Sequence, residues 1–214
     1  MVKSAFQHVT TWVFDLDNTL YPPRHRLFDQ IEVKMTAWVM RALNVSQTEA
    51  NRLRQHYWDI YGTTLAGLMR EHGVDPAPYL TEVHEIDFSG LPPDPDLAAR
   101  LAALPGRKIV YTNACVPYAH KVLAARGFDG LFDAVYGVEN ASFRPKPEHA
   151  AFAQVFAADG LDPTRAAMFE DDPRNLAAPH AMGMQTVLVT PKPLKARHIH
   201  HHTDDLAGFL ARVI

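Results

Sequence analysis

The sequence contains a single cysteine, Cys115, among 214 residues, so no disulfide can form within the chain. That usage fits a reducing compartment. No apolar run approaches the ~20 residues that span a bilayer. Residues 1–9 also lack the charged-then-apolar layout of a secretory signal. We therefore expect a cytoplasmic protein without a membrane partner.

Strong charge of either sign is missing as well. The net charge is -3, with 21 Lys and Arg against 24 Asp and Glu. No basic stripe with interleaved aromatic side chains is present, so nothing favours nucleic-acid binding. Repeats and low-complexity tracts are absent. With 47% hydrophobic residues, the chain can bury a substantial core, and its length fits one domain with an insertion.

The most informative segment covers residues 14–23 and reads Phe-Asp-Leu-Asp-Asn-Thr-Leu-Tyr-Pro-Pro. The apolar residues before it predict a buried strand, and Asp15 and Asp17, two positions apart, point to one face. Two carboxylates at close quarters repel unless a cation lies between them or one is protonated. The pair therefore predicts a divalent-metal site or acid–base chemistry. A solvated turn is the ordinary alternative.

Two later segments supply partners for such a site. A second apolar strand ends on Thr112 and Asn113, which places a hydroxyl donor at its tip. Lys146 precedes Pro147, which is well placed to begin a helix near Glu148, and a helix N-terminus favours anions. The ordinary alternative for Thr112 is the role of a helix cap. The ordinary alternative for Lys146 is a solvated charge on the surface.

A third segment runs from an apolar strand at 166–169 into Glu170, Asp171 and Asp172. These carboxylates are hard oxygen ligands at a strand end, although an acidic first turn of a helix is the ordinary alternative. The carboxyl ends of parallel strands open on one edge of a sheet, where α/β proteins bind ligands. We therefore expect these segments and the Asp15 segment to build one site.

These motifs, in this order, resemble those of the haloacid dehalogenase superfamily of phosphohydrolases over nearly the whole chain. Within it the chain is most similar to the pyrimidine 5'-nucleotidase group, through residues 15–22, the Tyr-Gly-Thr-Thr-Leu-Ala-Gly-Leu run at 61–68 and Pro-Gly-Arg-Lys at 105–108. The resemblance implies an α/β fold in which a Rossmann-like parallel sheet carries a small inserted α-helical cap.

The pattern along the chain agrees with that fold. Helical periodicity follows the first strand, and strand and helix alternate after Pro93. We expect residues 1–21 and 92–214 to form the core and residues 22–91 the cap. A strand is expected at 187–189, and a last helix is expected to open at Thr203.

The resemblance also implies roles for the polar residues. Asp15 would attack phosphorus and form an aspartyl phosphate, while Asp17 would protonate the leaving oxygen and then activate water. Thr112, Asn113 and Lys146 would hold the phosphoryl oxygens together with Asp15. Mg²⁺ would be bound by Asp15, the backbone carbonyl of Asp17 and one downstream acid. An acid at position 17 favours a phosphatase or a phosphomutase over a dehalogenase.

The fourth motif departs from the usual pattern of these nucleotidases, which is Asp-Asp-Ser followed two residues later by Asn. Here residues 170–175 read Glu-Asp-Asp-Pro-Arg-Asn. We expect Asp171 to be the metal ligand, with Glu170, Asp172 and Asn175 around it. The added charge of Asp172 either tightens magnesium binding or caps the following helix.

The predicted cap would cover the catalytic edge and contact the leaving group. Tyr21, Tyr61, Thr64 and His84 are the candidates for contacting a base or ribose, although packing is the commoner role of such residues. Cys115 has no histidine partner that the sequence identifies, so we expect it to fill space beside the site. The histidines at 198–202 lack the cysteine or acid that would complete a zinc-ligand spacing.

The sequence thus predicts a magnesium-dependent phosphomonoesterase for pyrimidine nucleoside 5'-monophosphates, a monomer or homodimer whose partner is a small phosphorylated metabolite. Phosphoglycolate or a sugar phosphate is the alternative substrate. A phosphomutase would need a cap that excludes water. Outside the enzymes, the alternative is a non-catalytic protein that binds a phosphorylated metabolite or a partner protein. Such a binder needs no pair like Asp15 and Asp17.

Overall fold

The strands of the chain form a single parallel sheet, described by a computed structural model that covers residues 2–214. All neighbouring pairs are parallel, in the order β3-β2-β1-β4-β5-β6. This architecture confirms the predicted α/β fold. The strands are β1 (Thr11–Phe14), β2 (Arg107–Tyr111), β3 (Ala134–Tyr136), β4 (Ala166–Glu170), β5 (Gln185–Val189) and β6 (His201–Thr203).

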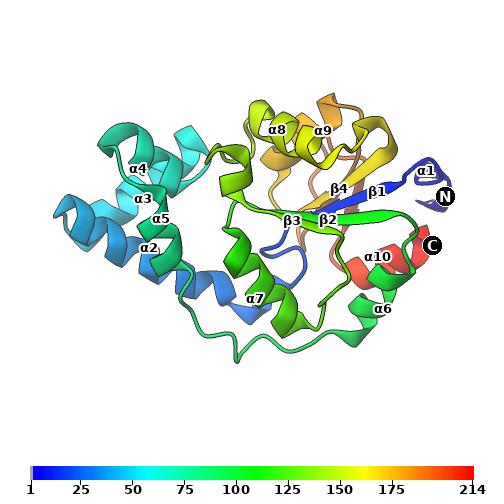
Figure 1. The fold of residues 1–214 in the computed structure, drawn as a ribbon, viewed down its shortest axis with the longest axis horizontal. Coiled ribbons are helices and arrows are strands. Elements are labelled where there is room, and N and C mark those ends of the chain that lie inside the picture. Colours follow the sequence, from blue (N-terminus) through cyan, green and yellow to red (C-terminus); the bar gives the residue numbers. More distant parts are fainter. Residues whose placement is uncertain (1) are drawn as a thin grey trace.

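Helices cover both faces of this sheet. Figure 1 shows α8 and α9 on one side and α6, α7 and α10 on the other. The flanking helices are α1 (Val2–Ala5), α6 (Pro95–Ala103), α7 (Val116–Arg126), α8 (His149–Asp159), α9 (Ala177–Ala181) and α10 (Leu206–Val213). Short 3₁₀ helices lie at η1 (Pro23–His25), η2 (Val138–Ala141), η3 (Pro163–Arg165) and η4 (Pro173–Leu176).

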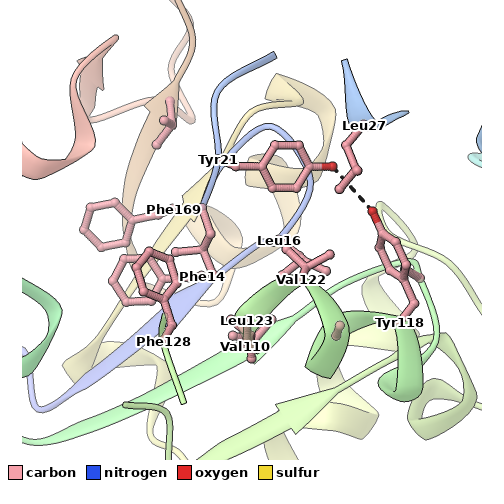
Figure 2. Packing of buried hydrophobic residues seen from close by; sticks show 14 of the residues in the cluster. Phe14, Leu16, Tyr21, Leu27, Val110, Tyr118, Val122, Leu123, Phe128 and Phe169 are labelled. Carbon is pink, nitrogen blue, oxygen red and sulfur yellow. Dashed lines mark hydrogen bonds between the residues drawn. The ribbon is translucent and has the colours of Figure 1, made fainter. Parts of the chain in front are cut away.

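Strand β1 is buried on both faces, as a central strand of a covered parallel sheet must be. Successive side chains point to opposite sides, so Phe14 joins one core and Val13 the other. Figure 2 shows Phe14 against Phe169, the neighbouring residue of β4, and their rings stack with centroids 4.7 Å apart. This packing fixes the end of β1 beside the end of β4.

Four helices form between β1 and α6, where the sequence predicts the cap. They lie together at one end of the molecule, beyond the carboxyl ends of the strands (Figure 1). The boundaries proposed at residues 22 and 91 stay a prediction. The helices are α2 (Leu27–Leu43), α3 (Gln47–Tyr61), α4 (Thr64–His72) and α5 (Pro76–Val83).

The cap reaches the core at Gly62, which ends α3 with a φ of 86°. A Cβ at this position would lie 2.9 Å from the carbonyl oxygen of Lys146 and 3.1 Å from Pro147 Cδ. Only glycine combines this left-handed backbone with so close an approach. The end of α3 therefore rests directly on the segment that carries Lys146.

One predicted helix start is wrong. Thr203 belongs to β6, because residues 201–203 pair with β5 and extend the sheet, and α10 begins at Leu206 after the capping residue Asp205. The helix predicted near Glu148 is present as α8, which starts at His149 after the capping residue Glu148, so Pro147 lies just before it. Among residues 2–214, no histidine belongs to a cluster that could hold a metal ion.

Candidate active site

The site forms where the strand order reverses. From β1 the sheet continues to β2 and β3 on one side and to β4, β5 and β6 on the other. Ligands of open α/β sheets bind outside the carboxyl ends of the strands at such a point. Asp15 directly follows β1 and Glu170 ends β4, so the topology brings these two carboxylates to the same crevice.

Lys146 connects the two strand ends. Its ammonium donates to Asp15 Oδ1 and to Glu170 Oε2, both at 2.6 Å, and to the carbonyl oxygen of Tyr111 at 3.1 Å. The lysine side chain is only 1% exposed. Burial alone would lower the pKa of this ammonium, but the charges and hydrogen bonds of the two carboxylates raise it above its usual value. The residue therefore remains a cation.

One ammonium does not balance the acids around it. Burial, followed by the charge of Glu170, raises the pKa of Asp15 to about 7, against the opposing effect of Lys146. Burial and the charge of Glu170 also raise the pKa of Asp171 well above its usual range. The site therefore holds more acidic groups than cations, and a further cation would stabilise their ionised forms.

The donor set at this point suits a divalent cation. Carboxylate oxygens of Asp15, Glu170 and Asp171 all lie within 4.8 Å of one another, the only such group among residues 2–214. Hard oxygen donors of this kind are the ligands that Mg²⁺ prefers. Glu170 is already engaged, because Oε2 accepts from Lys146 and Oε1 from the backbone N–H of Asp172. Asp15 is engaged as well, because its Oδ1 accepts from Lys146 and its Oδ2 from Thr19.

The carboxyl group of Asp17 is held by two tyrosines. Its Oδ1 accepts a hydrogen bond from Tyr21 at 2.5 Å and from Tyr118 at 2.7 Å. Figure 2 shows the two tyrosine hydroxyls facing each other. Burial raises the pKa of Asp17, and the two hydrogen bonds oppose that rise. Tyr118, on α7, has no motif around it that could have identified it from the sequence.

The segments that carry Thr112 and Lys146 are joined by Asn113. Its amide donates to the carbonyl oxygen of Lys146 at 3.1 Å and accepts from the Lys146 N–H at 2.8 Å. Thr112 is buried, and its hydroxyl accepts from the Ala114 N–H at 3.0 Å. Asn113 thus positions the lysine, while its predicted contact with phosphoryl oxygens stays a prediction, as does that of Thr112. Thr19 donates to Asp15 Oδ2 at 3.1 Å.

Of the two roles open for Asp172, the structure displays the helix cap. Its carboxylate accepts from the Arg174 N–H at 2.9 Å and pairs with the Arg174 guanidinium at 2.7 Å. That guanidinium stacks 3.4 Å from the ring centroid of Trp58 in α3, so the acidic segment also contacts the cap. Asn175 is buried, and its side-chain oxygen has no hydrogen-bond partner among residues 2–214.

A cleft of about 1090 Å³ joins the helices α2 to α5 with the carboxyl edge of the sheet. Asp17 and Asn113 contribute from the edge of the sheet, and Thr64 and His84 line it from the cap segment. The other two predicted substrate contacts, Tyr21 and Tyr61, are not among the described residues that line the cleft. Tyr21 gives its hydroxyl to Asp17, and that of Tyr61 donates to Glu71.

The structure supplies the histidine neighbour of Cys115 that the sequence did not identify. Cys115 Sγ lies 3.2 Å from His84 Nδ1. Burial lowers the pKa of His84 to about 4 and raises that of the Cys115 thiol. Both groups are therefore neutral near pH 7, so this contact does not activate the cysteine as a nucleophile.

Fold and site together define an α/β protein with an acid-rich, lysine-bridged crevice at the switch point of a parallel sheet. A family model described as a haloacid dehalogenase-like hydrolase matches residues 9–183. The chain belongs to this hydrolase family, which confirms the resemblance seen in the motifs. No helix among residues 2–214 is both long enough and apolar enough to cross a membrane.

Several known proteins are similar to this chain. Phosphate metabolism protein 8 of Saccharomyces cerevisiae is 26% identical over 193 residues, which cover 82% of this chain and 60% of the yeast protein. The structure of CbbY from Rhodobacter sphaeroides in complex with phosphate matches with a TM-score of 0.64, 18% identity and coverage of 93% and 95% of the two chains.

The HAD-hydrolase YfnB from Bacillus subtilis, solved bound to magnesium, matches with a TM-score of 0.59 and 16% identity, over 96% of this chain and 98% of YfnB. At these identities the two structural matches establish the fold alone.

Proposed function

We propose that the protein is a phosphomonoesterase that hydrolyses pyrimidine nucleoside 5'-monophosphates. The observation that supports this most strongly is the buried Lys146 ammonium, 2.6 Å from Asp15 in the same crevice as Asp17. The ammonium attracts a phosphoryl group to the nucleophile, and the second acid supplies the proton that the leaving oxygen needs. A binding protein would need no such acid.

In the proposed reaction, an oxygen of Asp15 attacks phosphorus while the bond from phosphorus to the ester oxygen breaks. The leaving oxygen takes the proton of the Asp17 carboxyl group, which the raised pKa of Asp17 favours. Asp17 then removes a proton from water, whose oxygen attacks the aspartyl phosphate and releases inorganic phosphate. Lys146 and Thr19 hold the Asp15 carboxylate in position for both steps.

Asp15, Asp171 and the backbone carbonyl of Asp17 would hold Mg²⁺ at this site. When bound, the ion supplies positive charge that offsets the charge of the phosphoryl oxygens. The excess of buried carboxylates over ammonium groups is the feature of this chain that supports the assignment.

The cleft supports a leaving group larger than glycolate. Its volume of about 1090 Å³ slightly exceeds the usual range for small-molecule pockets, and it extends from Asp17 into the cap helices. The phosphate bound in the CbbY structure and the name of the yeast relative support phosphate chemistry. The yeast protein is longer than the matched region, so the activity of the whole yeast protein is not assigned to this chain.

A substrate comparison tests the proposal. Initial rates with Mg²⁺ are measured on UMP, CMP, AMP, ribose 5-phosphate and phosphoglycolate. We expect kcat/KM for UMP and CMP to exceed that for AMP by at least about tenfold, because one or two specific contacts with the leaving group are worth that factor. A higher value for phosphoglycolate than for UMP would contradict the nucleotide assignment.

We also predict that magnesium binding changes the thermal stability of the protein. Mg²⁺ is expected to raise the melting temperature of the wild type, because a ligand at about 100 times its Kd stabilises the folded state by about 2.7 kcal/mol. Asp171→Asn should remove most of this shift, since a carboxylate ligand of the site is lost. Asp129→Asn, at an exposed position, serves as the matched control. An equal magnesium shift in Asp171→Asn would contradict the assigned ligand.

A further inference from the structure

Two buried polar atoms in the cap have no hydrogen-bond partner, and both belong to residues that line the cleft. They are Nε of Arg54, on α3, and the hydroxyl of Tyr79, on α5. Tyr79 is 3% exposed. A buried polar group without a partner destabilises the folded protein, so native structures contain few of them. Two such atoms on one cleft are what a ligand-binding subsite presents before its ligand arrives.

The remaining guanidinium nitrogens of Arg54 are engaged. One donates to the Thr36 hydroxyl at 2.7 Å and the other to Glu32 Oε1 at 3.2 Å. Thr36 lies 2.9 Å from the Asn51 side-chain oxygen, which completes a polar network across α2 and α3. The network fixes the arginine and leaves one N–H without an acceptor. It also balances the positive charge of Arg54 with the carboxylate of Glu32.

Tyr79 presents a second donor close to the first. Burial raises the pKa of its hydroxyl, and the nearby charge of Arg54 lowers it only in part, so the group stays protonated. The ring is held edge-on against Trp38, with centroids 5.1 Å apart. The Thr64 side chain also lowers this pKa, which is the effect of a donor facing the Tyr79 oxygen, although the contact is too loose to count as a hydrogen bond. The O–H proton of Tyr79 therefore has no acceptor and can be donated to a ligand.

We propose that Arg54 and Tyr79 form a subsite for the end of the leaving group that lies farthest from phosphorus, and that this subsite binds a ring carbonyl. A carbonyl oxygen has two lone pairs and can accept from both donors. Because Glu32 already pairs with Arg54, a neutral acceptor fits better than a second anion. This inference rests on the proposed nucleotidase function and names the residues that would set its specificity.

The surroundings suit a flat, neutral ring. The cleft wall includes apolar side chains on three cap helices, which would contact the faces of a base while the carbonyl meets the two donors. These side chains are Ile31, Met35, Leu65, Leu80 and Val83. Uracil and cytosine both carry a carbonyl at C2, whereas adenine has none. The subsite therefore gives a physical reason for preferring UMP and CMP to AMP.

Tyr79→Phe is the decisive variant, because it removes one oxygen that makes no hydrogen bond in the free protein. Its melting temperature is expected to equal or exceed that of the wild type, since a buried unsatisfied hydroxyl disappears. The ratio of kcat/KM for UMP to that for ribose 5-phosphate is expected to fall about tenfold, the usual effect of losing one hydrogen bond. Arg54→Lys, which keeps the charge but loses the Nε donor, should lower the same ratio.

Tyr57→Phe is the matched control. Tyr57 is also a buried cap tyrosine, but its hydroxyl already has a partner, His72 Nε2 at 2.7 Å, and the residue does not line the cleft. This variant should lower the melting temperature and leave the substrate ratio as in the wild type. A merely structural role for Tyr79 would produce the same result as Tyr57→Phe.

The outcomes separate the two proposals. A wild type that prefers UMP, with a ratio that falls in Tyr79→Phe and not in Tyr57→Phe, supports the subsite. A wild type that prefers UMP but an unchanged ratio in Tyr79→Phe overturns the subsite and leaves the nucleotidase function standing. A wild type that does not prefer UMP to ribose 5-phosphate overturns both. A Tyr79-dependent preference for a sugar bisphosphate overturns the choice of a neutral acceptor.

Discussion

Replacing Asp15 by asparagine is expected to lower phosphate release from p-nitrophenyl phosphate by on the order of 10⁵-fold, as loss of a nucleophile does in other covalent mechanisms. The amide has a similar shape, but it is not a competent nucleophile toward phosphorus. Lys146 and Thr19 would remain in place around it. Initial rates with saturating Mg²⁺, compared with those of the wild type, provide the measurement.

The fold should survive this substitution. The pKa of Asp15 is about 7 in the folded chain and its ordinary value is 3.8, so its protonated form stabilises the fold and that contribution is lost as the pH rises through about 7. At about pH 8, asparagine removes this penalty, and the melting temperature should equal or exceed that of the wild type. Asp129→Asn, exposed between α7 and β3, controls for the general effect of the amide. Retention of substantial activity in Asp15→Asn would refute the covalent mechanism.

Replacing Lys146 by methionine is expected to abolish activity and to destabilise the fold. The change leaves Asp15 and Glu170 buried without the ammonium that contacts both at 2.6 Å. Removing one partner of a buried ion pair typically lowers the free energy of unfolding by about 3–5 kcal/mol. Thermal and urea unfolding in EDTA, together with the hydrolysis rate, measure the two effects.

The pH dependence of the stability loss in Lys146→Met tests whether that loss is electrostatic. Lys146 lowers the pKa of Asp15, so its removal raises that pKa further above about 7. Below that pH the Asp15 carboxyl takes up a proton in the folded variant, and the difference in stability from the wild type should shrink. Lys121→Met, at an exposed position of α7, should have little effect at any pH. A stability loss in Lys146→Met that is the same at acid and alkaline pH would exclude the electrostatic explanation.

Much of the fold and of the site was predictable because the strands are short apolar runs that end on polar residues. That pattern indicated Asp15, Thr112 and Glu170, and parallel topology requires strand ends to share an edge. Lys146 lies outside this pattern, in the segment that precedes α8. Strand β6 was missed because residues 201–203 are two histidines and a threonine, without an apolar run. They extend the sheet only because the backbone of β5 is available to pair with them.

The roles of individual side chains were less accessible. Tyr118 reaches Asp17 from a helix that begins 99 residues later, and nothing in its local sequence marks it. The sequence did not indicate that the Tyr21 hydroxyl donates to Asp17, and the predicted substrate contact of Tyr21 stays a prediction. Cys115 contacts a histidine of the cap segment, His84, that no sequence spacing could have indicated.

The sequence by itself determined the chemical groups and their attachment to strand ends, because periodicity and local backbone preferences act over a few neighbouring residues. Only the tertiary structure decided which groups meet. It placed one ammonium between Asp15 and Glu170 and gave two tyrosine hydroxyls to Asp17. Within residues 2–214 it also left the Nε of Arg54 and the hydroxyl of Tyr79 without hydrogen-bond partners. Hydrogen bonds and pKa values depend on distances of a few ångströms between segments far apart in the chain, and packing of the whole core sets those distances.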